Sequence, residues 1–171
     1  LNEDKLYEYL LFRQTSGEDT LFKNIKRFIP AQVLEYDIKK DEAKKQNFWR
    51  LEKKNLGAID FEQELTERLD KSVENHLLSD VPVGVQLSGG VDSSLVVALA
   101  SRHKANLNTY SIGLKDDSWN EFRYSRMVAE KYKTIHHELI FSEEDFCRAL
   151  PRLTYFHDEP ISHSHSVPMY F

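Results

Sequence analysis

The sequence predicts an α/β fold in which a partial parallel sheet with flanking helices follows a short α+β segment. After residue 60, short runs rich in Val and Ile alternate with longer amphipathic runs, and this alternation is typical of βαβ units. A composition of 40% hydrophobic and 30% charged residues is sufficient for a globular core. We expect three parallel strands, fewer than the roughly five or six of a typical sheet.

The first segment is expected to combine helices with a hairpin. Apolar residues recur at helical spacing over residues 3–13, so a short helix is predicted there, and Gly17 follows it in a turn. A second helix is predicted over 20–30, where the apolar residues share one helical face. Residues 32–37 alternate as a strand, and the polar stretch 39–47 is expected to form a hairpin or a loop.

A change in composition near residues 55–57 marks a boundary, and the α/β elements follow it. Apolar residues recur every four positions from 60 to 79, which predicts a long amphipathic helix with Asp60 as its N-cap. The Val-rich run 81–87 favours a buried parallel strand. Ser142 and Asp145 have the spacing of a helix cap. The remaining elements are expected as a helix at 93–103, a strand at 107–114, a helix at 122–132, a strand at 134–141 and a helix after Ser142.

Charge and hydropathy argue against nucleic acid or a membrane as partners. The formal net charge is −5, whereas binding to phosphate backbones needs clustered Lys and Arg. No apolar run approaches the roughly 20 residues that span a bilayer, and the charged start is unlike a signal peptide. The absence of an initiator Met and the apolar end VPMYF predict a fragment of a longer chain.

The chain contains a single cysteine, Cys147. An intrachain disulfide is therefore impossible, which favours a reducing compartment and a cytoplasmic location. Because Cys147 is at helical spacing with Phe146 and Leu150, we expect a buried structural thiol rather than a reactive one.

The stretch GVQLSGGVDSSL, at 84–95, lies between a predicted strand and a predicted helix. Its glycines allow the backbone to approach a phosphate, and the helix amino end adds N–H groups and a positive dipole. Asp92 suits such a site where Mg²⁺ accompanies the phosphates. No Lys follows the glycines, so the pattern is not a P-loop, nor is it GxGxxG. The structural alternative is a tight Gly-Gly turn capped by serine.

This loop resembles SGGxDS, the pyrophosphate loop of the N-type ATP pyrophosphatases, which cleave ATP between the α and β phosphates. The surrounding residues are similar, in order and spacing, to those of the asparagine synthetase family. They are SDVPVGVQL at 79–87, YSIGL at 110–114, Glu121, HHE at 136–138 and DEP at 158–160. The first 50 residues also resemble the segment that leads from the glutaminase domain of that family into its synthetase domain.

The resemblance implies an adenine nucleotide alpha hydrolase-like fold and a division of the chain into two parts. Residues 1–55 would be the end of a glutaminase domain and an interdomain segment, and 56–171 the incomplete N-terminal part of an ATP-dependent synthetase domain. In the family a carboxylate, aspartate in typical members, attacks the α-phosphate of MgATP and releases pyrophosphate. Ammonia from glutamine then displaces AMP to form the amide. The glutaminase domain would lie outside this chain, and a homodimer is a further expectation.

Site residues are carried over from the same resemblance. Asp92 would be the catalytic residue and the Mg²⁺ ligand. Ile112 and Leu87 would contact the adenosine from the ends of adjacent strands. The full set expected to bind ATP is Leu87, Ser88, Gly89, Gly90, Asp92, Ser93, Ser94 and Ile112.

Several residues depart from the family pattern. Neither Leu1 nor Cys147 is the N-terminal cysteine nucleophile of the glutaminase reaction, and the later SGEGxDE loop and lysine are absent. We therefore expect weak or no activity from these 171 residues alone. His163 stands where the family has an acidic residue after the DEP motif. This change indicates either a different acceptor carboxylate or neutral drift in a loop.

Two other functions remain open on the sequence. One is an amidotransferase that uses another acceptor, as in polysaccharide, secondary-metabolite or β-lactam-forming pathways, and the other is a non-catalytic nucleotide-binding module. His157, His163 and His165 also raise a transition-metal alternative, although their pattern is a loose match to known sites. His136 and His137 lie in a predicted strand, so at most one of them faces a nucleotide.

Overall fold

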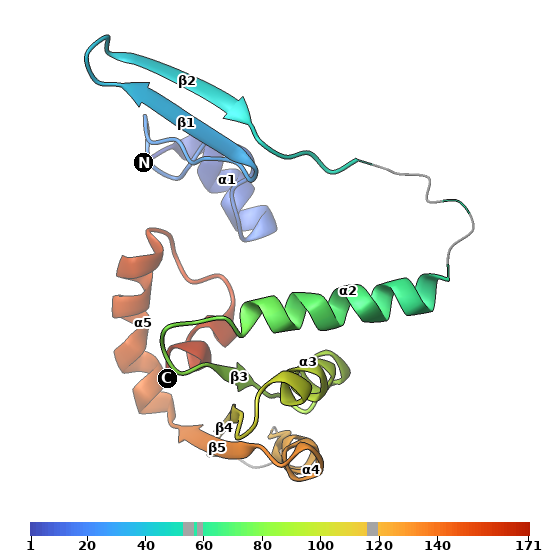
Figure 1. Ribbon diagram of the computed structural model, residues 1–171. Helices are drawn as coiled ribbons and strands as arrows, with labels where there is room; N and C mark the ends of the chain where they lie inside the picture. Colours follow the sequence, from blue (N-terminus) through green and yellow to red (C-terminus); the bar gives the residue numbers. More distant parts are fainter. Residues whose placement is uncertain (53–56, 58–59, 116–119) are drawn as a thin grey trace. The chain divides into compact units, whose positions relative to one another are not determined.

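The chain folds into two compact units, Leu1–Gly57 and Ala58–Phe171 (Figure 1). The computed structural model describes residues 1–52, 57, 60–115 and 120–171. Among these residues, no helix combines the length and the apolar character that a membrane span requires.

The first unit contains one helix and one hairpin. Helix α1 spans Glu3–Phe12, and strands β1 (Gln32–Asp37) and β2 (Glu42–Asn47) pair antiparallel. The predicted helix, strand and hairpin are therefore confirmed. In the described part of this unit, the buried residues are Tyr9, Thr15 and Leu21.

The helix predicted over 20–30 is wrong. The Thr20 hydroxyl accepts a hydrogen bond from the Phe22 N–H at 3.1 Å and donates to the Ile25 carbonyl at 2.8 Å. These local bonds compete with helix formation, as is typical of Ser and Thr in turns. Asn24 also has a left-handed backbone, with φ of 65°, which interrupts any helix.

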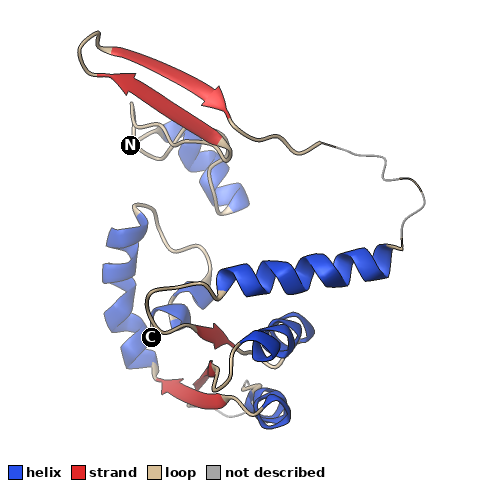
Figure 2. Ribbon diagram, viewed as in Figure 1, coloured by secondary structure: helices blue, strands red, loops and turns tan. Residues whose placement is uncertain are grey.

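The second unit has the predicted α/β architecture (Figure 2). Helix α2 (Phe61–His76) begins at the Asp60 N-cap, whose carboxylate accepts from the Gln63 N–H at 3.1 Å. The elements that follow in this unit are β3 (Gly84–Gln86), α3 (Val91–His103), β4 (Asn108–Leu114), α4 (Phe122–Tyr132), β5 (Ile135–Phe141) and α5 (Glu143–His157). The three strands form a parallel sheet in the order β3-β4-β5.

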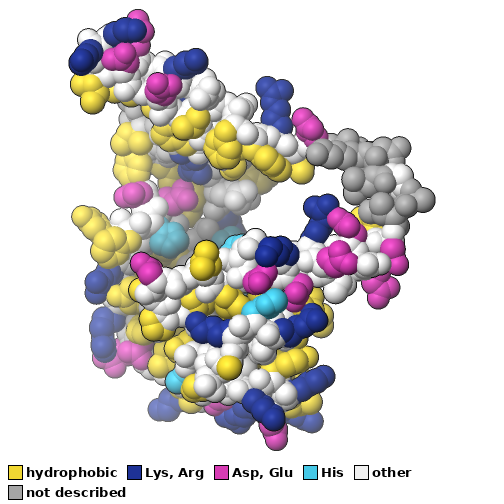
Figure 3. All heavy atoms as spheres, viewed as in Figure 1, with side chains coloured by type: hydrophobic (Ala, Val, Ile, Leu, Met, Phe, Trp, Pro, Cys, Tyr) yellow, Lys and Arg dark blue, Asp and Glu magenta, His cyan; other side chains and the backbone are white. Residues whose placement is uncertain are grey.

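Helix α2 is amphipathic, as expected. Leu69 and Val73 are half-buried on the side that packs against α3. Its outer side carries interspersed acidic and basic side chains (Figure 3), including the ion pair Arg68–Glu64 at 2.6 Å. The helix therefore covers α3 with its apolar side.

Two boundaries differ from the prediction over 81–103. Strand β3 is three residues long, because Pro82 has no N–H to donate to a ladder and the Ser79 hydroxyl holds the Val81 N–H in a turn at 3.2 Å. Its residues are exposed or half-buried rather than buried. Helix α3 begins two residues early, at Val91, with Gly90 as its N-cap.

The core lies on one face of the sheet, under α3 and α4. Leu87, Val97 and Ala129 form a buried cluster, which joins the end of β3 to both helices. A second cluster, Ala149, Leu153 and Val167, joins α5 to the 3₁₀ turns at 164–170. The loop that follows β3 is thus attached to the most buried part of this unit.

Candidate functional site

Leu87 fixes the start of the SGGVDS loop, residues 88–93. Its side chain is 1% exposed, and its N–H donates to the Tyr110 carbonyl at 2.8 Å. Its carbonyl accepts a hydrogen bond from the buried Ser111 hydroxyl. Both backbone groups of Leu87 are therefore held by β4 immediately before the loop begins.

The serine hydroxyls close the loop on itself. The Ser88 and Ser93 hydroxyl oxygens lie 3.0 Å apart, and Ser88 Oγ accepts from the Gly90 N–H at 3.3 Å. The Gly90 carbonyl accepts from the hydroxyls of Ser93 at 3.2 Å and Ser94 at 2.7 Å. The Ser94 side chain thus caps the loop from inside, whereas Ser88 and Ser93 are the hydroxyls that can rotate toward a ligand.

The amino end of α3 supplies backbone donors to the same loop. The Ser94 N–H makes the first bond of the helix, to the Gly90 carbonyl at 3.0 Å. The preceding N–H groups, of Val91, Asp92 and Ser93, lie in the first turn, where a helix offers them no acceptor. Together with the positive end of the helix dipole, they form an arrangement that suits a phosphate.

Gly89 allows the loop to pack against the start of α4. It has a φ of 85°, in the left-handed region. A Cβ at this position would lie 2.6 Å from Tyr124 Cβ and 2.7 Å from the Ser125 amide nitrogen. The glycine is therefore required by its backbone conformation and by contact with α4, in addition to any ligand.

Asp92 is exposed in the first turn of α3. Across the described residues, no hydrogen bond or ion pair engages its carboxylate. Mg²⁺ is typically held by one or two carboxylates together with phosphate oxygens and water. The free carboxylate of Asp92 fits the first kind of ligand, and the adjacent N–H groups fit the phosphates that would supply the second. Within the described ranges, no group of three or more His, Cys, Asp or Glu side chains is placed to hold a metal, so His157, His163 and His165 are not assembled into a site.

Ile112, in the neighbouring strand β4, directs its backbone groups toward the loop. Alternate residues of a parallel strand direct their N–H and C=O groups to the same side. Tyr110 directs its carbonyl to the β3 side, where it meets Leu87. Ile112 and Leu114 have the same orientation, but β3 has already ended at Gln86. Their backbone groups therefore face the region where the loop replaces a strand.

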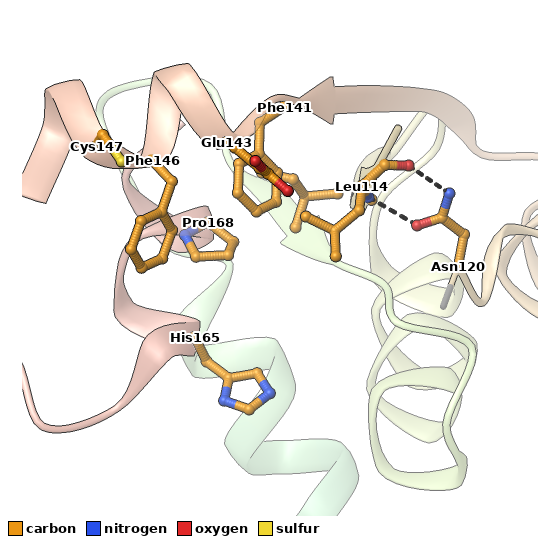
Figure 4. Close-up of a pocket in the computed structure, with 10 residues that line it drawn as sticks. Leu114, Asn120, Phe141, Glu143, Phe146, Cys147, His165 and Pro168 are labelled. Atoms are coloured by element: carbon orange, nitrogen blue, oxygen red, sulfur yellow. Dashed lines mark hydrogen bonds between the residues drawn. The ribbon is translucent and has the colours of Figure 1, made fainter. Parts of the chain in front are cut away.

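Leu114 is engaged by a side chain rather than by a strand. The Asn120 amide accepts from the Leu114 N–H and donates to the Leu114 carbonyl, both at 2.7 Å (Figure 4). Ile112, two residues earlier, is the position on this edge whose polar groups remain directed toward the loop. This arrangement places a donor and an acceptor of Ile112 beside the loop and the amino end of α3.

A cavity of about 730 Å³ adjoins this edge (Figure 4). It lies at the carboxyl ends of β4 and β5, next to α5 and the 3₁₀ turns. Most of its lining is apolar, with Glu143, Cys147, His165 and Asn120 as the ionisable or amide side chains. The lining residues are Ile112, Gly113, Leu114, Asn120, Phe141, Glu143, Phe146, Cys147, His165 and Pro168.

Cys147 is exposed in this cavity, so the expectation of a buried thiol is wrong. The buried side of α5 is formed by Ala149 and Leu153, with half-buried Phe146 and Leu150 beside them. These residues follow the i, i+3, i+4, i+7 spacing of one helical face, and Cys147 lies outside it.

A polar cluster connects α4 to the sheet. Arg126 forms a bidentate ion pair with Glu138, with both N–O distances at 2.6 Å, and this hydrogen bonding lowers the pKa of Glu138. His136 Nδ1 lies 3.0 Å from the Thr109 hydroxyl, and burial lowers the pKa of His136. His137 points to the opposite face, as predicted, and stacks on Tyr110. The cluster holds α4, and with it the contact to Gly89.

The structure brings the predicted site residues together. Residues 87–94 form the loop and the start of α3, and Ile112 lies on the adjacent strand. His163 is exposed and is not among the residues that line the cavity, whereas His165 is. The sequence interpretation missed Asn120 and the Arg126–Glu138 pair. An Asn two residues before the predicted helix 122–132 was the available signal for the first.

The chain was compared with known proteins. The family model for asparagine synthase matches residues 64–171, more than half of the chain. The chain is 31% identical over 176 residues to a putative asparagine synthetase [glutamine-hydrolyzing] 2 of Methanocaldococcus jannaschii, with 99% of this chain and 34% of that protein covered. It is 27% identical over 176 residues to asparagine synthetase [glutamine-hydrolyzing] 1 of Bacillus subtilis, with 100% and 27% covered.

Among solved structures, the chain is similar to a glutamine-dependent NAD⁺ synthetase from Acinetobacter baumannii in complex with ADP. The TM-score is 0.47 at 17% identity, with 79% of this chain and 25% of that chain covered. The chain spans about a third or less of the length of the curated relatives it matches. The family match, over the part that holds the loop, α3 and Ile112, shows that the chain belongs to the asparagine synthase family.

Proposed function

We propose that the chain carries the ATP-binding part of an AMP-forming ligase that makes an amide. A substrate carboxylate, aspartate by similarity to the named relatives, attacks the α-phosphate of ATP and releases pyrophosphate. Ammonia from glutamine then displaces AMP from the acyl-adenylate. The observation that carries this proposal is the loop at 88–93, whose glycines and helix amino end offer several backbone donors to one anion.

The residues of the loop bind and orient the leaving pyrophosphate. The N–H groups of Val91, Asp92 and Ser93 point out of the first turn of α3 and require no rearrangement. Ser88 and Ser93 hold each other in the free protein, so their hydroxyls rotate when they bind phosphate oxygens. Donors that are already oriented stabilise the charge that develops as the α–β bond breaks.

Asp92 would hold Mg²⁺. The metal, when bound, neutralises charge on the leaving pyrophosphate. The exposed carboxylate and its proximity to the phosphate donors fit this role. They also favour an active ligase over a non-catalytic binding module, because a carboxylate without a cation would repel the phosphates.

Ile112 would bind the adenine base. Its backbone offers an N–H donor and a C=O acceptor on one edge, and adenine offers an acceptor at N1 and a donor at its amino group. The apolar cavity beside Ile112 suits a flat ring. The lining residues include neither Lys nor Arg, so the cavity suits a base better than the two carboxylates of aspartate.

The same proposal assigns each part of the chain to a domain. We infer that residues 1–55 are the end of a glutaminase domain and an interdomain segment, and that 56–171 form the N-terminal part of a synthetase domain in the cytoplasm. The relatives are named glutamine-hydrolyzing, which supports glutamine as the source of ammonia. His163 lies outside the lining of the cavity proposed for the base, so its departure from the family pattern does not bear on base binding.

The test is binding of pyrophosphate to the chain, by calorimetry with Mg²⁺ and with EDTA. Asp92→Asn keeps the shape of the side chain and removes its charge. We expect the Mg²⁺-dependent affinity to fall about tenfold, a loss of about 1.4 kcal/mol, and the affinity in EDTA to remain or rise. Asp4→Asn is the matched control, since Asp4 occupies the first turn of α1. Equal affinities of wild type and Asp92→Asn in Mg²⁺ contradict the metal role.

A further inference from the structure

The end of β4 is completed by the side chain of Asn120. We propose that Asn120 is a positioning residue for the nucleotide base, because its amide occupies the backbone groups of Leu114 and leaves Ile112 as the pairing position for adenine. This proposal rests on the ATP site proposed above. It assigns a role to a residue that lies outside the SGGVDS loop.

The geometry supports a two-point contact. Asn120 Oδ1 accepts from the Leu114 N–H and Asn120 Nδ2 donates to the Leu114 carbonyl, both at 2.7 Å (Figure 4). Leu114 is the last residue of β4 and has no β3 partner, because β3 pairs only as far as Tyr110 in the ladder. The amide therefore takes the place that a neighbouring strand would fill.

Gly113 provides the space for this contact. A Cβ at Gly113 would lie 2.5 Å from Asn120 Oδ1 and 2.5 Å from Phe122 Cζ. Asn120 itself is half-buried, two residues before the start of α4. The amide is thus held between the strand end and the helix start, and it does not move freely in solvent.

Only an amide satisfies both groups of Leu114. A carboxylate has acceptors but no donor for the Leu114 carbonyl, and an apolar side chain has neither. Without the amide, Leu114 would present a second donor–acceptor pair, two residues beyond Ile112. Two residues of a strand span about 6.6 Å, so a base paired there would displace the α-phosphate from the loop. A displacement of this size is incompatible with in-line attack on the α-phosphate.

The first experiment tests the contact without any ligand. Amide hydrogen exchange of the 171-residue chain is followed by NMR in wild type, Asn120→Ala and Asn120→Asp. We expect the Leu114 amide to lose protection at least tenfold in Asn120→Ala, because its acceptor is gone. Asn120→Asp keeps an acceptor for that amide and is expected to retain more of the protection. Unchanged exchange at Leu114 in Asn120→Ala overturns the proposal.

The second experiment tests base positioning. Binding of ATP, inosine triphosphate and pyrophosphate is measured in Mg²⁺ for the same variants. The base of inosine triphosphate carries a carbonyl in place of the amino group and a hydrogen on N1, so neither of the two hydrogen bonds to Ile112 can form. Wild type is therefore expected to prefer ATP at least about tenfold. Asn120→Ala and Asn120→Asp are expected to reduce this preference to below about threefold, with pyrophosphate affinity unchanged.

Two measurements distinguish base positioning from a merely structural role of Asn120: the affinity for pyrophosphate and the behaviour of a control variant. Loss of ATP and pyrophosphate affinity together would mean that the loop itself is disturbed, and it would overturn the positioning role. Asn108→Ala is the matched control, because Asn108 binds His137 at the opposite end of β4 at 2.9 Å. A wild-type chain with no preference for ATP over pyrophosphate contradicts the ATP site. A wild-type preference for ATP over inosine triphosphate that survives in Asn120→Ala overturns the present inference alone.

Discussion

The two units of the chain differ in how firmly their backbone is fixed. In the first unit, the hairpin strand β2 is exposed along its whole length, and among the described residues only Tyr9, Thr15 and Leu21 are buried. In the second unit, Leu87, Val97 and Leu107 are at most 1% exposed. The candidate site is in the second unit, and each segment that forms it is attached to that core.

This difference shows what the proposed phosphate loop requires from its surroundings. Glycines give the loop freedom, but Leu87 before it, α3 after it and Tyr124 beside it remove most of that freedom. Donors that are fixed before the ligand arrives need little reorganisation when it binds. The first unit has no comparable set of constraints among its described residues, and its role is better sought in contacts with other chain segments.

The largest expected effect comes from removing the core beneath the loop. Leu87→Ala is expected to destabilise the second unit by about 2–5 kcal/mol, because it leaves a cavity beside Val97 and Ala129. Leu10→Ala, at a residue that is 71% exposed in α1, is expected to change stability by less than about 0.5 kcal/mol. Urea unfolding, monitored by hydrogen exchange in peptides of each unit, measures the loss of stability in both variants. Equal losses for the two variants would refute the contrast between the units.

A smaller effect is expected from two of the left-handed glycines, Gly17 and Gly89. Gly17 in the first unit has φ of 73° and open space where a Cβ would lie, with nothing within 4 Å, whereas Gly89 has φ of 85° and contacts α4. Ala at either position is expected to cost about 1–2 kcal/mol through its backbone conformation. Gly89→Ala should cost more than Gly17→Ala, and it alone should weaken pyrophosphate binding. Thermal unfolding and calorimetry check this, and an equal cost at both positions would show that the contact with Tyr124 relaxes freely.

Much of the second unit follows from local patterns, and the failures have identifiable causes. The Asp60 and Ser142 caps and both ends of the helix at 122–132 were predicted, because capping and periodicity are local properties. The loop was predicted from its glycines and its position between a strand and a helix. The helix over 20–30 failed, because hydrogen bonds from one hydroxyl, that of Thr20, outweighed its apolar periodicity.

The parts of the site that could not be predicted depend on contacts between different elements of the fold. Asn120 binds a strand end six residues earlier, and Arg126 binds Glu138 across α4 and β5. Neither partner is indicated by spacing, since each pair forms only when the helix packs on the sheet. Exposure of Cys147 likewise depends on which side of α5 meets the 3₁₀ turns.

The smallest expected effect is a dependence on pH that is confined to the second unit. The first unit contains no histidine, whereas His136 lies against Thr109 with Glu138, Arg126 and His137 as its charged or titratable neighbours. Burial, more than any of these neighbours, lowers the pKa of His136 from its usual value of 6.5.

A lowered pKa means that the unfolded chain takes up a proton before the folded chain does. Stability is therefore full above pH 6.5 and falls as the pH drops toward the lower folded value, with a slope of at most about 1.4 kcal/mol per pH unit for one proton. The pKa of Glu138 is also lowered, from 4.5, so its contribution is lost only at more acidic pH. Thermal unfolding from pH 7.5 to 5.0 covers the range in which histidine titrates, and His136→Gln should flatten the dependence of the second unit. A slope that persists in His136→Gln, or one that appears equally in peptides of the first unit, would assign the acid sensitivity to other groups.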